Sequence, residues 1–441
     1  MPNCRAHFPL SLSGINGCKW SNCGISKACG TAGTKKRSLF GLDVVRRMVL
    51  SWFASRVNPI AVDIGTDTIK LLQVEPKDGQ HRLVAAACET IPEEIRSRNA
   101  DRDNYVGEAI RKMLMEGFRG KQVVTCLPAN QMAVQHLRMA KMTAEELVKA
   151  LPFEAAGKLP FDAGRAVLRH TISGEVYQNQ EAKQEVILMA APREAVDRHL
   201  ALLSKLKLEV VGIHVEPTAL IECFGHLFKR KGDENLSTLF IDMGAGSTHV
   251  VIAHGKNMVF AKHINIGGDL FNIKVSEAVK MSVGNAKELR IKVAHHLSQV
   301  SRLPAGVVAL NDGNDAHPLG KQNNGTNGKA IDNELIAKVT NAVGDSVQSL
   351  ITELQLCVRY YESIFAGRTI DRAIFVGGES RHVSLCQIVA QKLGLPATLG
   401  DPLARLIKDE VAKTNVDLRQ PQPGWAIAVG LAIGLSSSTT E

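Results

Sequence analysis

The sequence of 441 residues predicts an α/β protein of two lobes, because the same strand–turn–strand pattern occurs in each half. The pattern appears at Pro59–Glu75 (PIAVDIGTDTIKLLQVE) and returns at Leu239–His254 (LFIDMGAGSTHVVIAH). Repetition at the separation of a whole domain is typical of a duplicated architecture. With 45% hydrophobic and 22% charged residues, the chain is long and apolar enough to bury a core in each lobe.

The first copy carries residue types that bind a phosphate and its metal ion. Asp63 ends a short apolar strand, Gly65 opens the turn, and Thr66, Asp67 and Thr68 form it. The N–H and hydroxyl groups of such a turn can bind an anion, and a carboxylate at the strand end can hold Mg²⁺. Alone, this hairpin fits an ordinary surface turn better than a binding site.

The second copy changes that interpretation. The corresponding positions are occupied by Asp242, Gly244, Gly246, Ser247 and Thr248. If the two halves face one another, their turns would hold one phosphate chain from opposite sides. We therefore predict a single phosphate site between the lobes.

A third segment, Ile374–Arg381 (IFVGGESR), reads as a buried strand that ends in a pair of glycines. Together with DIGTDTIK and DMGAGST, it resembles the adenosine and phosphate motifs of the superfamily that contains actin, the sugar kinases and the heat-shock chaperone ATPases. The resemblance implies a two-lobed actin-like fold, which is a duplicated ribonuclease H-like architecture. It also implies ATP and Mg²⁺ as cofactors.

The same resemblance assigns roles to individual residues. Asp63 and Asp242 would hold Mg²⁺, and Arg381 would stack on the base. Glu216 takes the place of an acid that orients the metal and the attacking water, although a carboxylate that opens a helix beside Pro217 explains it equally well. The implied nucleotide contacts are Asp63, Gly65, Thr66, Asp67, Thr68, Lys70, Asp242, Gly244, Gly246, Ser247, Thr248, Gly267, Gly268, Glu288, Gly377, Gly378, Ser380 and Arg381.

The net charge of +9 belongs almost entirely to the N-terminal segment. Residues 1–58 contain nine Lys and Arg against one acid, Asp43, which gives +8 and leaves +1 for the rest of the chain. This distribution argues against a nucleic-acid partner for the body. Two interpretations of residues 1–47 remain open: a disordered basic leader, or sequence that precedes a translation start at Met48.

The sequence also bears on whether the protein contacts a membrane. Residues 39–56 resemble a basic amphipathic helix that either touches a membrane surface or docks on the body. No apolar run reaches the roughly 18 to 20 residues that span a bilayer. We expect a protein that is at most peripheral to a membrane, and scattered cysteines that stay reduced.

An insertion at residues 127–213 distinguishes branches of the superfamily. Thr143–Glu146 forms a T-x-x-E capping box that opens an amphipathic helix with Pro152 in it, and strands and a second helix follow. The run LRMAKMTAEELVKALPFEAAGKLPFD, with EVILMAAPREAVDRHL after it, resembles the family of the pilus assembly protein PilM, a relative of FtsA. Lys207-Leu208-Glu209 departs from that pattern without touching the nucleotide motifs.

The resemblance divides the chain into parts. Lobe I is expected to contain residues 48–126 and 214–236, and lobe II residues 237–420, with a flexible loop at 302–333 and a long helix at 334–365. A helix within residues 421–441 would return to lobe I. Since the chain runs only a few residues past it, we expect neither the peptide-binding domain of a chaperone nor the membrane tail of an FtsA-type protein.

The function implied is an ATP-binding scaffold at the cytoplasmic face of the inner membrane. Its partner would be the N-terminal cytoplasmic peptide of a PilN-like protein, held near the Val123–Leu127 strand and the Glu145–Phe161 helix, with other pilus platform or motor proteins as further candidates. Hydrolysis of ATP would be slow. Two alternatives stay open, a cytoskeletal or cell-division filament and a small-molecule kinase.

Overall fold

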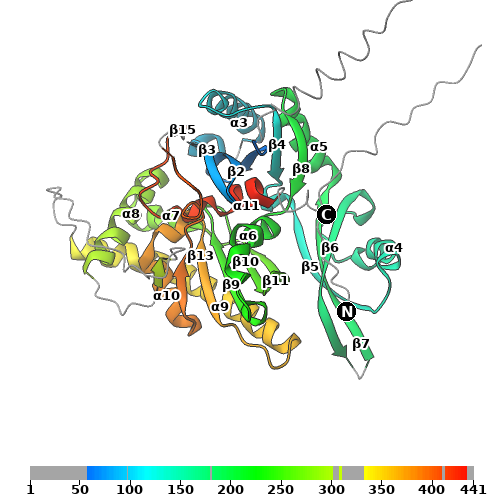
Figure 1. Ribbon diagram of the computed structural model, residues 1–441. Coiled ribbons are helices and arrows are strands. Elements are labelled where there is room, and N and C mark those ends of the chain that lie inside the picture. The colour runs from blue at the N-terminus through cyan, green and yellow to red at the C-terminus, as the bar shows by residue number, and fades with distance from the viewer. Residues whose placement is uncertain are drawn as a thin grey trace, which may run out of the picture.

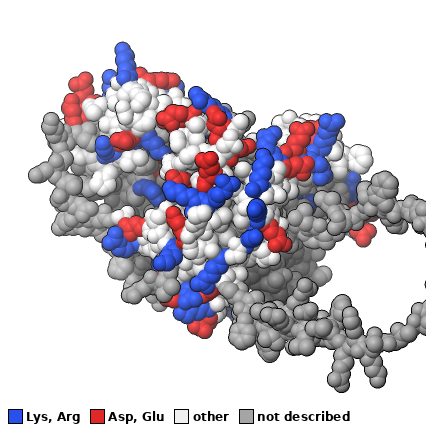
Figure 2. Space-filling model, turned by 90° about the horizontal axis from the view of Figure 1, so that it is seen from above, with Lys and Arg blue, Asp and Glu red and all other residues white. Residues whose placement is uncertain are grey.

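A computed structural model describes residues 57–96, 98–178, 181–300, 307–309, 332–409 and 413–434. Figure 1 shows two sheet-centred lobes beside one another, with a smaller sheet at one side. The leader 1–47, the amphipathic stretch up to residue 56 and most of the loop 302–333 lie outside the described residues. Figure 2 shows Lys and Arg interspersed with Asp and Glu over one face of the molecule.

Lobe I is built on a six-stranded sheet of order β15-β3-β2-β1-β4-β8. The first three strands form an antiparallel meander, and β4 and β8 continue the sheet in parallel beside β1. Its strands are β1 (Ile60–Ile64), β2 (Thr68–Lys77), β3 (Gln80–Thr90), β4 (Gln122–Cys126), β8 (Glu209–His214) and β15 (Lys413–Thr414). Its helices are α2 (Glu93–Arg96), α3 (Asn99–Leu114) and α5 (Arg193–Lys205).

Lobe II repeats this arrangement in a sheet of order β11-β10-β9-β13-β14-β12. Again a meander leads, and parallel strands follow on the far side of its first strand. Its strands are β9 (Ser237–Met243), β10 (Thr248–His254), β11 (Asn257–Ile264), β12 (Val307–Ala309), β13 (Arg372–Val376) and β14 (Ala397–Leu399). Its helices are α7 (Gly268–Val279), α8 (Val283–Val300), α9 (Asn333–Ile364) and α10 (Val383–Leu393). The matching topologies confirm the predicted two-lobed α/β class.

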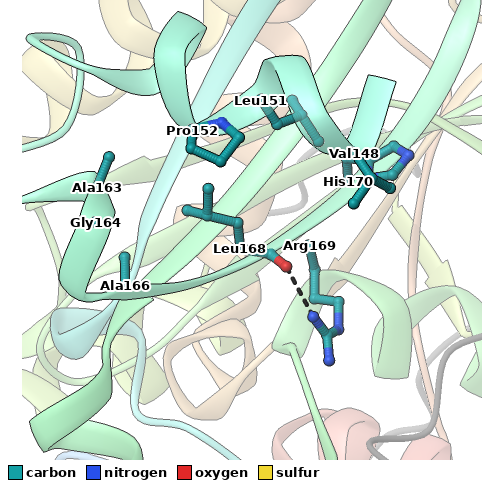
Figure 3. A pocket seen from close by; sticks show the side chains of 9 residues that line it. All are labelled: Val148, Leu151, Pro152, Ala163, Gly164, Ala166, Leu168, Arg169 and His170. Atoms are coloured by element: carbon teal, nitrogen blue, oxygen red, sulfur yellow. Dashed lines mark hydrogen bonds between the residues drawn. The ribbon is translucent and has the colours of Figure 1, made fainter. Parts of the chain in front are cut away.

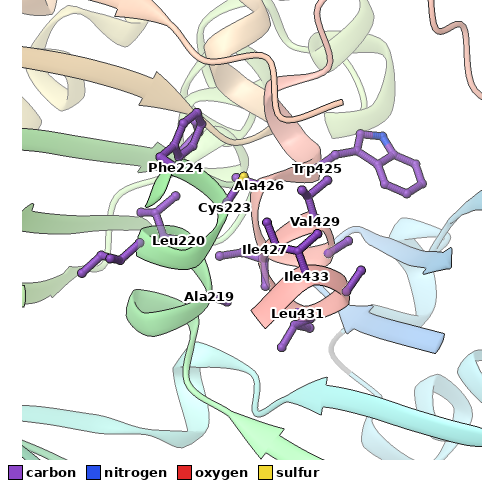
Figure 4. Close-up of a cluster of buried hydrophobic side chains, with 14 of the residues drawn as sticks. Ala219, Leu220, Cys223, Phe224, Trp425, Ala426, Ile427, Val429, Leu431 and Ile433 are labelled. Atoms are coloured by element: carbon purple, nitrogen blue, oxygen red, sulfur yellow. The ribbon is translucent and has the colours of Figure 1, made fainter. Parts of the chain in front are cut away.

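Two helices join the lobes through a shared apolar core (Figure 4). α6 (Glu216–Phe224) and α11 (Ala426–Gly434) pack so closely that a Cβ on Gly430 would collide with the backbone of Ala219. Residues 426–433 of α11 are all buried, so this helix is apolar on every side. The close crossing of α6 and α11 packs the C-terminal helix against the segment that leads from lobe I into lobe II.

The insertion forms its own three-stranded sheet of order β5-β7-β6 with one helix on it. The helix begins with the predicted capping box, in which Thr143 and Glu146 bond to each other's backbone N–H. Leu147, Leu151 and Ala155 are buried against the sheet at helical spacing. The elements are α4 (Ala144–Ala155), β5 (Ala133–Ala140), β6 (Ala166–Gln178) and β7 (Glu181–Pro192).

Some boundaries differ from the expected ones. Although assigned to the insertion, β8 pairs with β4 in the lobe I sheet, and α5 buries Leu203 in the lobe I core. The chain also returns to lobe I before residue 421, since β15 pairs with β3. Within the loop 302–333, β12 pairs with β14, a three-residue contact too short to leave a sequence signal.

The insertion packs on lobe II as well as on lobe I. Val176 of β6 is buried in the lobe II core, and the ring of His136 stacks on Phe260 at 4.8 Å. The buried carboxylate of Glu185 accepts hydrogen bonds from Arg138 of the insertion at 3.0 Å and from the Tyr360 hydroxyl of α9 at 2.9 Å. These contacts form the insert junction, and nothing in the local sequence of either partner predicted it.

Short 3₁₀ turns complete the chain at 129–131, 163–165, 225–228, 233–235, 378–381 and 423–425. Cys88, Cys126, Cys223, Cys357 and Cys386 are free thiols. In the part of the chain that the structure describes, each helix is too short or too polar to cross a bilayer.

Candidate functional site

A cleft of about 760 Å³ lies between the lobes and is lined by both hairpin turns and by the Gly-Gly strand end. Its volume is within the range of roughly 300 to 1,000 Å³ that is typical of ligand pockets. Most of the residues that the sequence assigned to a nucleotide line it: Asp63, Gly65, Thr66, Asp67, Thr68, Lys70, Glu216, Asp242, Gly244, Gly246, Ser247, Gly377, Gly378 and Arg381.

In the first hairpin, an acid and a cation stand opposite each other. Asp63 on β1 pairs in register with Lys70 on β2, and their charged groups are 3.5 Å apart. Burial raises the pKa of Asp63 to about 6, because the opposing effect of Lys70 is too small and the carboxylates of Glu216 and Asp242 add to the increase. The positive charge near Asp63 is therefore too small to offset the burial of its carboxylate.

The second hairpin has an equivalent pair of an acid and a base in the same register. Asp242 on β9 lies opposite His249 on β10, with Nδ1 and Oδ2 3.8 Å apart, and Glu216 at the start of α6 approaches the same Nδ1 to 2.8 Å. Burial alone would lower the pKa of His249, but Glu216 and Asp242 outweigh burial and raise the pKa to about 10. The two carboxylates therefore favour the protonated form of the His249 imidazole.

The tips of the two turns touch, and a Cβ on Gly246 would stand 2.8 Å from the Thr66 hydroxyl oxygen. Each turn closes on itself through one backbone bond, from Gly65 to Thr68 and from Gly244 to Ser247. Among the hydrogen bonds of the described residues, none uses the N–H of Thr66 or of Gly246. These donors are free to bind a phosphate group.

The donor set fits a magnesium nucleotide. Within the described ranges, no group of three or more His, Cys, Asp and Glu is placed to hold a metal ion by itself. Two cleft carboxylates, Asp63 and Asp242, suit Mg²⁺, which commonly takes one or two protein carboxylates and completes its shell with phosphate and water. Lys70 adds a cation beside them.

The third motif lies directly beneath the second hairpin. Gly377 has a left-handed backbone (φ +89°), and a side chain there would collide with Met243 and with the Asp242 carboxylate. Arg381 donates a hydrogen bond to Gln422 at 2.6 Å. The Gly-Gly strand end thus brings the backbone against Asp242 at the cleft floor.

Five predicted contacts lie outside the cleft lining. The Gly267–Gly268 turn supports the second hairpin instead, since the N–H of Gly268 and that of Asp269 bond to the carbonyls of Gly244 and Ala245. Thr248 bonds to the carbonyl of Ile266 in the same support. The Ser380 side chain is buried against the Val376 carbonyl, and Glu288 points to solvent and pairs with Lys292.

Sequence reasoning missed several cleft residues. His249 could have been found, because it follows Asp242 by the same seven positions that separate Lys70 from Asp63. Lys287 lines the cleft next to the exposed Glu288, and neighbouring residues on a helix differ by about 100° in direction. Arg96 and Cys88 also line the cleft, and their positions depend on how helices and strands pack.

A second hollow of about 620 Å³ lies within the insertion, between α4 and β6 (Figure 3). Val148, Leu151 and Pro152 form its helix wall, and Ala166, Leu168 and His170 form its strand wall. The Leu168 carbonyl accepts a hydrogen bond from Arg169 of the same strand at 2.8 Å, and β6 is an edge strand of its sheet. By contrast, Val123–Cys126 of β4 are buried between β1 and β8, so that strand offers no groove.

Comparison with known proteins decides the family. A family model described as "Type IV pilus assembly protein PilM" matches residues 61–299, more than half of the chain. The chain belongs to this family. A second model, for the cell division protein FtsA, matches residues 239–430 of this PilM-family chain.

Relatives and solved structures agree with this placement. The FtsA proteins of Enterococcus hirae and Enterococcus faecalis are 23% and 24% identical to this PilM-family chain over 262 and 268 residues, and in each case 53% of the chain is covered. The chain spans 57% of the length of either relative. A structure titled "PilM-PilN type IV pilus biogenesis complex" matches with a TM-score of 0.66 at 20% identity and covers 86% of this chain and 99% of its own. This likeness confirms the actin-like fold.

Proposed function

We propose that this PilM-family protein binds ATP with Mg²⁺ between its lobes and serves as a scaffold of a type IV pilus assembly complex. One observation carries the nucleotide part: two aspartates, each opposite a cation in matching hairpins, face one cleft whose turns have free N–H donors. The actin-like fold supports the same conclusion, since nucleotide binding is common to that superfamily.

The chain's own residues would divide the work. Asp63 and Asp242 would hold Mg²⁺, Lys70 and the two turns would bind the phosphates, and Gly377–Gly378 would lie beneath the adenosine. ATP supplies a terminal phosphoryl group whose transfer needs an oriented water. Glu216 would orient that water, since it lines the cleft and its carboxylate lies 2.8 Å from Nδ1 of His249. Positioning a water demands more of the site than binding a nucleotide does, so we expect slow turnover.

Calorimetry with Mg²⁺ and a non-hydrolysable ATP analogue tests the nucleotide part. We expect the parent protein to bind, and Asp63→Asn and Asp242→Asn each to weaken binding by about a hundredfold or more. Lys262→Ala is a matched control, since it removes a partly exposed ion pair with Glu353 inside lobe II. Absence of binding by the parent protein with Mg²⁺ present would refute the proposal.

The second part of the proposal is a partner. The protein would capture the N-terminal cytoplasmic peptide of a PilN-like inner-membrane protein, and thereby lie at the cytoplasmic face of the inner membrane next to other platform or motor proteins. Two observations support this part: the similar structure is titled a PilM–PilN complex, and the insertion has an apolar groove beside an edge strand. A peptide could pair with the backbone of β6 and place alternate apolar side chains against Val148 and Leu168.

Fluorescence anisotropy with a labelled apolar N-terminal peptide tests this placement. We expect Val148→Asp to lower peptide affinity by about tenfold or more, because it puts an unpaired charge into the groove. Phe153→Asp is the matched control, since Phe153 lies on the same helix with 82% of its surface exposed and outside the groove. Equal affinity in both variants would move the peptide site elsewhere.

A second function, an ATP-dependent filament, is favoured by the FtsA model that matches residues 239–430. It predicts ordered polymers with ATP and Mg²⁺ in negative-stain micrographs. A scaffold that captures a peptide stays dispersed under the same conditions.

A further inference from the structure

Two ion pairs of opposite polarity join the lobes beside the cleft. Arg96 of α2 in lobe I lies 3.2 Å from Asp269 of α7 in lobe II. Lys287 of α8 in lobe II lies 3.3 Å from Asp67 in the first turn of lobe I. Each lobe therefore contributes one cation and one anion, and we call this group the clasp.

The four charges form one cluster. The side chains of the two pairs are 15% to 32% exposed, so water screens them only in part. Asp269 interacts electrostatically with Arg96, Lys287 and Asp67, as well as with Glu379 behind it. The lobes also approach each other where Glu93 of α2 lies near Gly284 at the start of α8, and a carboxylate there interacts favourably with the helix dipole.

Further hydrogen bonds fix the side chains in and next to the clasp. Arg96 also donates from Nε to the Ile91 carbonyl at 3.0 Å, so its guanidinium is fixed toward lobe II. Glu379, which repels Asp269, is neutralised by a bidentate pair with buried Arg290 at 2.8 and 3.0 Å. Two-point contacts of this kind restrict the side chains more than single exposed ion pairs do.

Three of the four clasp residues, Asp67, Arg96 and Lys287, line the same cleft as the aspartates and the Gly-Gly strand end. We infer that the clasp is a gate for the nucleotide site: it must open before a nucleotide enters or leaves, and it sets the exchange rate. This inference rests on the proposed nucleotide function and adds its regulation. It predicts a site whose exchange is slow at low ionic strength and is accelerated by salt.

Stopped-flow kinetics with a fluorescent (mant) ATP and Mg²⁺ separate a gate from a direct contact. A gate changes association and dissociation together, whereas a lost contact to the nucleotide changes dissociation alone. For Arg96→Asp we expect both rates to rise about tenfold while the affinity stays within about threefold. Raising NaCl from about 0.05 to 0.5 M should accelerate exchange in the parent protein and have little effect in this variant.

The reversed polarity allows a rescue experiment. Arg96→Asp combined with Asp269→Arg restores an ion pair across the cleft, so both rates should return to within about threefold of the parent values. Lys262→Ala should leave them unchanged, and thermal unfolding verifies that each variant is folded. Unchanged rates in Arg96→Asp, or a double variant as fast as the single one, would overturn the gate while leaving nucleotide binding intact. Failure of the parent protein to bind mant-ATP would overturn the proposed nucleotide function and the gate with it.

Discussion

The two hairpins that face the cleft share one design and differ in a single cation. Asp63 and Asp242 end equivalent strands, and each lies opposite a cation seven positions later, Lys70 in lobe I and His249 in lobe II. Lys70 forms an ion pair with one carboxylate, that of Asp63. His249 serves two, because Glu216 from the helix that follows β8 joins Asp242 on the same imidazole nitrogen.

The difference teaches how a duplicated motif acquires two roles. The lobe I pair leaves Asp63 short of positive charge, with a pKa near 6, so it gains most from an incoming metal ion. The lobe II cation already lies between two carboxylates, those of Asp242 and Glu216. We therefore expect the first hairpin to be the one better suited to metal binding, and the second to orient Glu216 as well.

The largest expected difference between the hairpins concerns loss of the cation. His249→Ala leaves Asp242 and Glu216 buried without their partner, which should cost about 3–5 kcal/mol of unfolding free energy at pH 7.5. Lys70→Ala should cost less, and the loss should shrink at pH 5.5, because Asp63 becomes protonated. Urea unfolding at both pH values measures this, and equal losses at pH 7.5 would contradict the asymmetry.

Neutralising the acids should shift stability in opposite directions. In the absence of Mg²⁺ at pH 8, Asp63→Asn removes a buried charge whose burial outweighs its attraction to Lys70. Because Lys70 loses its partner in this variant, the net stabilisation should be only about 1 kcal/mol. Asp242→Asn removes a partner of the His249 imidazolium and should destabilise it by a similar amount. Thermal unfolding of the two variants gives the signs, and a shared sign would show that the pairs are equivalent.

Proton linkage sharpens the comparison further. The pKa of Asp63 is raised in the folded protein, so its contribution to stability is greatest at acid pH and is lost as the pH rises through about 6. Mg²⁺ needs the ionised carboxylate, so affinity for a magnesium nucleotide should fall about tenfold per pH unit below 6. Titration calorimetry from pH 5 to 8 measures this slope. Asp63→Asn should abolish it, and a slope that persists in that variant would assign it to another group.

The smallest effect is expected when the hairpins are made alike. His249→Lys keeps a cation between Asp242 and Glu216, so nucleotide affinity should stay within about threefold of the parent value. A phosphate-release assay should nevertheless show turnover lowered by about tenfold, because a flexible ammonium holds Glu216 less rigidly than an imidazole does. Turnover as fast as the parent rate would remove His249 from the positioning role.

The sequence was most informative where contacts are local. The hairpins, the Gly-Gly strand end and the Thr143 capping box depend on residues a few positions apart, and all were recognised. The choice between Glu288 and Lys287 depends on how α8 is rotated, and the bond from Gly268 to Gly244 depends on how α7 docks. The clasp and the insert junction join residues that are far apart in the chain, and no local pattern announces them.

The insert junction has a mechanical consequence. The insertion is covalently continuous with lobe I, yet its sheet also contacts lobe II. Tyr360 donates a hydrogen bond to Glu185, and Phe260 stacks on His136. A tension applied to the strands beside α4 would thus be transmitted to the opposite lobe directly, bypassing the α6–α11 crossing. A force on the insertion would therefore act on both lobes, and so on both walls of the cleft, at the same time.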